Sequence, residues 1–151
     1  MILPPHNNSD HREFRQGIDL FNRVQFFDAH EVLEDIWRSV PRDLALRRHL
    51  QGMVQLAVAF HHHSTGNHLG AFSVLVRAIR NLDGAENSFP HIDLARLRTD
   101  LEPWRTYLES SNALVASNDA PSKAPALPRI ILRDQADPIR VLHTAPARIL
   151  F

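Results

Sequence analysis

The chain has no cysteine among its 151 residues and no net formal charge. Without cysteine it can form no disulfide framework, no thiolate metal site and no cysteine nucleophile. Seventeen basic side chains balance seventeen acidic ones, so the chain lacks the basic excess that unspecific nucleic-acid binding requires. Its ten histidines therefore decide the net charge near neutral pH.

Long apolar runs are also missing. The longest, around residues 53–60, is far shorter than a membrane span. The first six residues have neither the basic region nor the apolar core of a signal peptide. We therefore expect a cytosolic protein with no membrane-spanning segment.

Apolar residues recur at spacings of three and four, which is the periodicity of amphipathic helices. No stretch before residue 117 alternates as a strand would. The sequence thus predicts an all-α fold, a compact bundle of five to six helices. The expected helices begin near Ser9 and cover about 26–40, 42–65 and 67–82, with a fifth from Asp93 and a sixth from Pro103.

Specific residues are expected to bound these helices. Ser9 with Asp10, Asn67 and Asp93 are suited to cap helix N-termini, and Gly66 is suited to the position after a helix end. Proline fits the first turn of a helix, so Pro103 is expected to restart the chain as a separate helix.

The composition changes near residue 117. Half of the ten prolines follow it, together with short apolar clusters at 130–132, 139–142 and 149–151. We expect residues 1–116 to form the bundle domain and 117–151 a proline-rich linker and an extended arm. The arm would dock on its own bundle or on a neighbouring subunit, and short β pairing could occur there.

The second helix places an acid and a base among apolar residues. At roughly 100° per residue, His30 and Glu34 share a face with Phe26, Phe27, Leu33 and Trp37, while Glu31 lies on the flank. A buried carboxylate is costly unless it is paired. We therefore expect a partner for Glu34.

The third helix offers partners for that face. Gln51, Gln55 and His62 form a polar line beside its apolar arc, His61 lies inside the arc, and His63 points outward. The two helices together predict a buried polar pocket, to which either His61 or His62 contributes. Its expected residues are His30, Glu31, Glu34, Trp37, Gln51, Gln55 and His62.

The sequence resembles a known family in these two helices. The run FDAHEVLEDIW at 27–37, followed by LQGMVQLAVAFHH at 50–62 and Gly66-Asn67, is similar to the small helical family called domain of unknown function 309. The resemblance covers about residues 14–83 and implies an all-α bundle. It implies little about activity.

The spacing of His30 and Glu34 also admits a metal site. It is the i, i+4 ligand spacing of the His-Glu-x-x-His zinc helix, with Glu34 in place of the second histidine. His62 would complete a three-ligand site for a divalent metal, and Glu31 would be the general base on a bound water. Gln51 and Gln55 instead suit a hydrogen-bonded network, with Arg38 neutralising Glu34.

Three functional hypotheses follow. The first is a protein that binds a small ligand or a partner at the His/Glu/Gln pocket. The second is a metal-dependent hydrolase built on the His-Glu-x-x-Glu helix. The third is a structural homo-oligomer clasped by the C-terminal arm. Membrane and nucleic-acid partners are not expected.

Overall fold

The computed structural model describes residues 8–117 and 123–133, and these residues are helical apart from turns, one 3₁₀ turn and an extended segment. The expected all-α fold is confirmed over this part of the chain. It contains five α-helices: α1 (Asn8–Asn22), α2 (Phe26–Ser39), α3 (Ala45–Ser64), α4 (His68–Asn81) and α5 (Leu94–Ser117). The 3₁₀ turn η1 (Ala85–Asn87) lies between α4 and α5.

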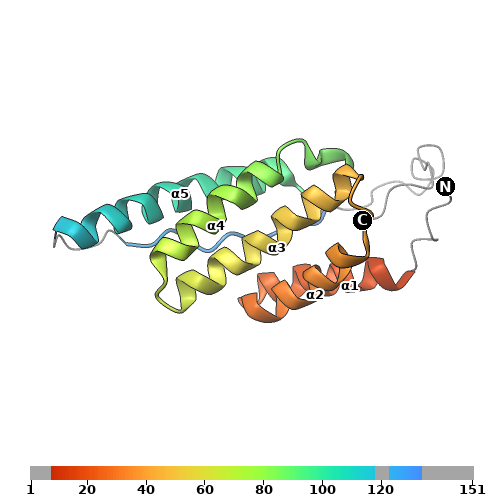
Figure 1. Cartoon of the computed structure of the whole chain (residues 1–151), viewed down its shortest axis with the longest axis horizontal. Coiled ribbons are helices and arrows are strands. Elements are labelled where there is room, and N and C mark those ends of the chain that lie inside the picture. Colours follow the sequence, from red (N-terminus) through yellow and green to blue (C-terminus); the bar gives the residue numbers. More distant parts are fainter. Residues whose placement is uncertain (1–7, 118–122, 134–151) are drawn as a thin grey trace.

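The helices pack in chain order. α1 packs on α2, α3 lies between α2 and α4, and α4 packs on α5 (Figure 1). None of the described helices combines the length and the hydrophobicity that a membrane span needs.

An aromatic cluster joins four of the helices. The ring of Phe60 on α3 lies 6.0 Å from Phe21 on α1, 5.6 Å from Phe26 on α2 and 5.0 Å from Trp104 on α5, measured between ring centroids. Phe21 and Phe26 also contact each other, with ring centroids 5.1 Å apart. Three of these four ring contacts are edge-on, an arrangement that adds electrostatic attraction to the burial of apolar area. Phe60 of α3 therefore connects α1 and α2 on one side with α5 on the other.

The expected caps of α4 and α5 are confirmed. The Asn67 side chain accepts a hydrogen bond from the Gly70 amide at 2.9 Å, and the Asp93 side chain accepts one from the Arg96 amide at 3.1 Å. Gly66, which follows α3, has a φ of +84°, a conformation that glycine adopts without strain. α1 begins at Asn8, so Ser9 and Asp10 lie within its first turn.

The expected helix break at Pro103 is wrong, because α5 continues through this residue to Ser117. Leu97, Leu101, Trp104 and Leu108 follow the helical spacing across the proline and are all buried. Their burial outweighs the hydrogen bond that proline cannot donate, and Pro103 itself faces solvent. The third helix also begins later than expected, because residues 41–44 form a turn closed by the Leu44 amide and the Pro41 carbonyl.

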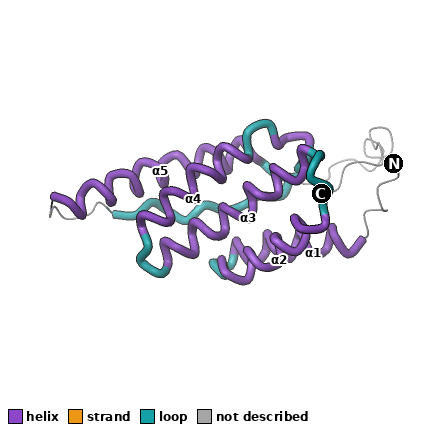
Figure 2. Tube along the Cα trace, in the orientation of Figure 1, coloured by secondary structure: helices purple, strands orange, loops and turns teal. Residues whose placement is uncertain are grey.

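Residues 123–133 form an extended segment that runs back along α5, coloured blue in Figure 1 and teal in Figure 2. Trp104 donates its indole N–H to the Ala126 carbonyl at 2.8 Å. Farther along, Leu132 pairs with Ile92 in an isolated antiparallel bridge, as the expectation of short β pairing allowed. We call residues 123–133 the arm segment.

The arm segment also reaches α1. Asn22 donates its side-chain N–H to the Ile130 carbonyl at 2.9 Å and accepts from the Ile130 amide at 2.8 Å. Ile130 is buried in the core. The described part of the arm therefore docks on its own bundle. The linker at 118–122 and the apolar clusters at 139–142 and 149–151 lie outside the described residues.

Candidate functional site

His30, Glu34 and Arg38 form a row of ion pairs along α2. The Nε2 atom of His30 lies 2.9 Å from Oε2 of Glu34, and a guanidinium nitrogen of Arg38 lies 2.9 Å from Oε1 of the same carboxylate. This is the pairing that the network hypothesis expects. His30 also directs Nδ1 at the Phe27 carbonyl, 3.3 Å away. Both ring nitrogens of His30 thus lie near an oxygen atom, one of the Glu34 side chain and one of the backbone.

The row is half-buried rather than buried. The side chains of His30 and Glu34 are 24% and 26% exposed, and that of Arg38 is 65% exposed. The fully inward face of α2 is occupied instead by Phe26, Ala29, Leu33 and Ile36. His30 lies roughly 80° around the helix from the centre of that face. The ion pairs therefore form at the edge of the helix interface.

Phe27 is the large apolar residue on the solvent side of α2, with 50% of its surface exposed. Its ring centroid lies 5.5 Å from that of His30 and 5.3 Å from that of His61 on α3. Both imidazoles thus contact the Phe27 ring. His61, rather than His62, is thus the α3 histidine that comes close to this surface.

Carboxylates surround Phe27 on the exposed face of α2. Asp28, Glu31 and Asp35 are exposed, and Asp35 lies 3.9 Å from Arg38. Within residues 8–117 and 123–133, neither Asp28 nor Glu31 has an ion-pair partner. We call Phe27, Asp28, Glu31 and Asp35 the α2 face.

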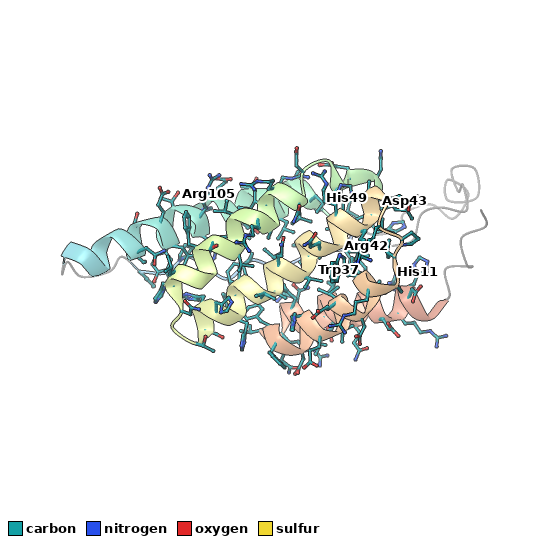
Figure 3. All side chains as sticks on the ribbon, viewed as in Figure 1. His11, Trp37, Arg42, Asp43, His49 and Arg105 are labelled. Atoms are coloured by element: carbon teal, nitrogen blue, oxygen red, sulfur yellow. The ribbon has the colours of Figure 1, made fainter. Side chains whose placement is uncertain are left out.

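Trp37 lies at the other end of α2, beside the start of α3 (Figure 3). The guanidinium carbon of Arg47 lies 4.4 Å from the centroid of the Trp37 ring. Arg47 also donates to the Trp37 carbonyl at 3.2 Å and to the Val40 carbonyl at 2.7 Å. A cation over an aromatic ring is stabilising, and a cation at a helix C-terminus is stabilising too. Arg47 thus links the first turn of α3 to the C-terminal end of α2.

The structure does not gather the remaining predicted pocket residues around His30. Gln55 accepts a hydrogen bond from Asn81 of α4 at 2.8 Å. Nδ1 of His62 faces the side-chain N–H of Asn67 at 3.3 Å. Gln51 is half-buried on α3, and Glu31 faces solvent. Gln55 and His62 of α3 thus contact α4 and the turn that follows α3, respectively.

The donor set expected for a metal site does not come together either. Within the part of the chain that the structure describes, no three His, Asp or Glu side chains lie close enough to hold one ion. His30 and Glu34 form a pair, but His62 is engaged at the end of α3. The geometry therefore does not support the role of Glu31 as a general base that activates a metal-bound water.

Two histidines outside the expected pocket pack against other parts of the bundle, His49 buried and His63 half-buried. His49 is 5% exposed, and its Nδ1 lies 2.5 Å from the Ser88 hydroxyl oxygen. Its Nε2 faces the Arg48 guanidinium at 3.5 Å. Burial, followed by the charge of Arg48, lowers the pKa of His49. His49 lies on the buried face of α3 at the apolar helical spacing, so this spacing could have predicted that its side chain is buried.

His63 was expected to point outward, and this is wrong. Its ring centroid lies 4.7 Å from that of Trp104 on α5 and 5.5 Å from that of His68 on α4. The face of α3 that would be exposed in a two-helix hairpin is covered by α5. Burial, with a smaller effect of His68, lowers the pKa of His63. The Nδ1 atoms of His63 and His68 are buried and have no hydrogen-bond partner among the described residues.

The match to a known family lies within the first four helices. Residues 14–74 match the family described as Domain of unknown function (DUF309). This confirms the resemblance seen in the sequence. The DUF309 segment includes the whole α2 face, and it excludes α5 and the arm segment.

Two uncharacterised proteins are similar to the chain. An uncharacterised protein of Bacillus subtilis (strain 168), YpuF, is 33% identical over 69 residues, which are 46% of this chain and 39% of that protein. An uncharacterised protein of Aquifex aeolicus (strain VF5) is 27% identical over 82 residues, which are 54% of this chain and 24% of that protein. The chain thus spans less than half the length of either relative.

Proposed function

We propose that the chain is a protein-interaction module that docks a basic segment of a partner protein on its α2 face. The observation that carries the proposal is the exposure of Phe27, which contacts two imidazoles and lies beside Asp28 and Glu31, two carboxylates without an ion-pair partner among the described residues. Aromatic residues are enriched at binding hot spots, since they bury a large area at low entropic cost. The first of the three hypotheses drawn from the sequence also included a partner, but at the buried His/Glu/Gln pocket and not at this exposed face.

Charge selects the kind of partner. α2 carries Asp28, Glu31, Glu34 and Asp35 against the single base Arg38, which gives 1 − 4 = −3. A lysine or arginine of the partner would lie over the exposed ring of Phe27, where the aromatic quadrupole attracts a cation. Neighbouring bases would pair with Asp28 and Glu31. Complementary charge of this kind speeds association and selects partners.

The other two hypotheses gain less support. The metal-dependent hydrolase lacks a third ligand beside His30 and Glu34 among the described residues. The homo-oligomer clasped by the arm has no support from the arm segment, whose hydrogen bonds are made within its own chain.

A direct test titrates the isotope-labelled chain with a synthetic basic peptide, acetyl-Arg-Leu-Arg-Leu-Arg-amide, at low salt. We expect saturable shifts of the α2 amides that weaken as salt rises. Phe27→Ala should weaken binding by roughly 30-fold, the loss typical of a hot-spot aromatic. Glu31→Lys should weaken it by about tenfold or more.

Glu102→Lys is the matched control. It makes the same charge reversal at an exposed site on α5, away from the α2 face. Each of these variants should keep its stability within about 0.5 kcal/mol, as exposed substitutions usually do. Equal weakening by Glu31→Lys and Glu102→Lys would show unspecific attraction and overturn the proposal. Shifts centred outside α2 would do the same.

A further inference from the structure

A cavity of about 400 Å³ lies between the second and third turns of α5 and the arm segment, outside the DUF309 segment. Small-molecule pockets in proteins start at roughly 300 Å³. Its apolar wall consists of Pro103 from α5 with Pro125, Leu127 and Ile131 from the arm segment. The hydrogen bond from Trp104 to the Ala126 carbonyl holds the two walls together.

One positive group of the lining is unpaired. Arg129 lines the cavity, and the structure gives it no ion pair or hydrogen bond within residues 8–117 and 123–133. Arg96 also lines the cavity, but its Nε lies 3.5 Å from the Asp100 carboxylate. With two bases and one acid, the lining has a charge of 2 − 1 = +1. It therefore complements a ligand that presents one carboxylate to Arg129.

The lining also holds acceptors for a donor group. Pro103 has no N–H, so the Thr99 carbonyl receives no helical hydrogen bond from the residue four positions later. Thr99 and Pro103 both line the cavity. The Asp100 carboxylate lies one residue along, with only a long contact to Arg96. A ligand with an ammonium or amide N–H would satisfy these oxygens.

We propose that this cavity binds an apolar α-amino acid, either free or as the C-terminal residue of a peptide. The carboxylate pairs with Arg129, the α-nitrogen donates toward the Thr99 carbonyl and Asp100, and the side chain packs on Pro125, Leu127 and Ile131. Such a ligand would use the cation, the oxygen acceptors and the apolar wall of the lining at the same time. The site is independent of the α2 face.

The test is a titration of the full chain with L-leucine, followed by the indole N–H signal of Trp104. The chain has two tryptophans, and Trp37→Phe assigns the two signals. Because the Trp104 indole bonds to a residue of the cavity wall, we expect its signal to shift saturably with leucine. The dipeptide Ala-Leu is titrated in parallel, and tighter binding of one or the other identifies the source of the ligand.

Altered ligands test each group. Leucinamide lacks the carboxylate and 4-methylpentanoate lacks the amine, so both should bind at least about tenfold more weakly. Arg129→Gln should weaken leucine binding by about 10- to 100-fold, the range for a hydrogen bond to a charged group. Arg105→Gln is the matched control, an exposed arginine of α5 outside the lining (Figure 3).

Three outcomes would overturn the proposal. One is the absence of a saturable Trp104 shift with both leucine and Ala-Leu. Another is equal binding by Arg129→Gln and Arg105→Gln. The third is binding of leucinamide or 4-methylpentanoate as tight as that of leucine, which would show that the group it lacks is not recognised.

Discussion

Asn22 binds the backbone of Ile130 with both polar atoms of its side chain, across 108 residues of sequence. The amide group takes the place that a neighbouring strand would take in a sheet, since it offers one donor and one acceptor to the same residue. The last described segment of the chain is thereby fixed to the end of its first helix.

Asn22→Ala should release the arm segment. Two hydrogen bonds are lost, and the Ile130 amide and carbonyl are left without partners near the core, so we expect a loss of about 1–3 kcal/mol in the free energy of unfolding. Hydrogen exchange should become faster over 123–133. Gln16→Ala, an exposed polar truncation on the same helix, should change neither measurement. Unchanged exchange in Asn22→Ala would mean that the other contacts suffice to hold the arm.

Glu34→Gln distinguishes a half-buried ion-pair row from a buried network. The side chains of His30, Glu34 and Arg38 are all partly exposed, so the loss in the free energy of unfolding should stay below about 1 kcal/mol. A buried network would lose several times more. Chemical denaturation measures the difference, with Glu31→Gln as the control, the same substitution at an exposed site of α2 outside the ion-pair row. A loss above about 3 kcal/mol would contradict the half-buried geometry.

The stability of the fold should fall with pH below about 6.5, the ordinary pKa of histidine. The pKa values of His49 and His63 are lowered, chiefly by burial, so the unfolded chain takes up protons more readily than the folded chain. The contribution of these two histidines to the free energy of unfolding is therefore fully present above pH 6.5. It decreases as the pH falls toward their folded-state pKa values.

Substitution of the two histidines tests this pH dependence. His49→Gln and His63→Phe each remove one titrating group, and each should flatten the decrease in denaturation midpoint between pH 7 and pH 5. His91→Gln is the control, a substitution at another half-buried histidine. A pH dependence that remains unchanged in the double variant would refute the assignment to these two groups.

Pro103→Ala should stabilise α5. Alanine supplies the N–H that the Thr99 carbonyl lacks, and it suits a helix interior better than proline by up to about 3 kcal/mol. Part of that gain is offset because alanine leaves the unfolded chain more flexible. Thermal denaturation should show a higher midpoint. A lower midpoint would mean that the Pro103 ring makes contacts with the arm segment that outweigh the missing hydrogen bond.

The sequence pattern was sufficient for the fold because apolar spacing, caps and a terminal glycine agree with one another. Asn67, Asp93 and Gly66 could be recognised because their roles depend on local backbone chemistry. Pro103 could not be judged in the same way, since its effect depends on buried residues on both sides of it. Whether the helix breaks or continues at this proline depends on tertiary packing.

The site on α2 was harder to predict because Phe27 is apolar yet exposed. Counting Phe27 and Trp37 with the inward residues rotates the expected apolar face toward His30, which then seems central. The ion pair of His30 with Glu34 depends only on i, i+4 spacing, so it could be predicted. The contact of His63 with α5 and the hydrogen bond between His49 and Ser88, after α4, depend on distant segments, and helical periodicity does not describe them.

The bond between Asn22 and Ile130 bears on how the chain folds as it is synthesised. α1 leaves the ribosome first, whereas its partner residue is added more than a hundred positions later. Helices α1 to α4 can associate through neighbours close in sequence, which is fast. The closing step must wait for the arm segment, so a nascent chain has a bundle whose α1 end is open until translation has passed residue 130.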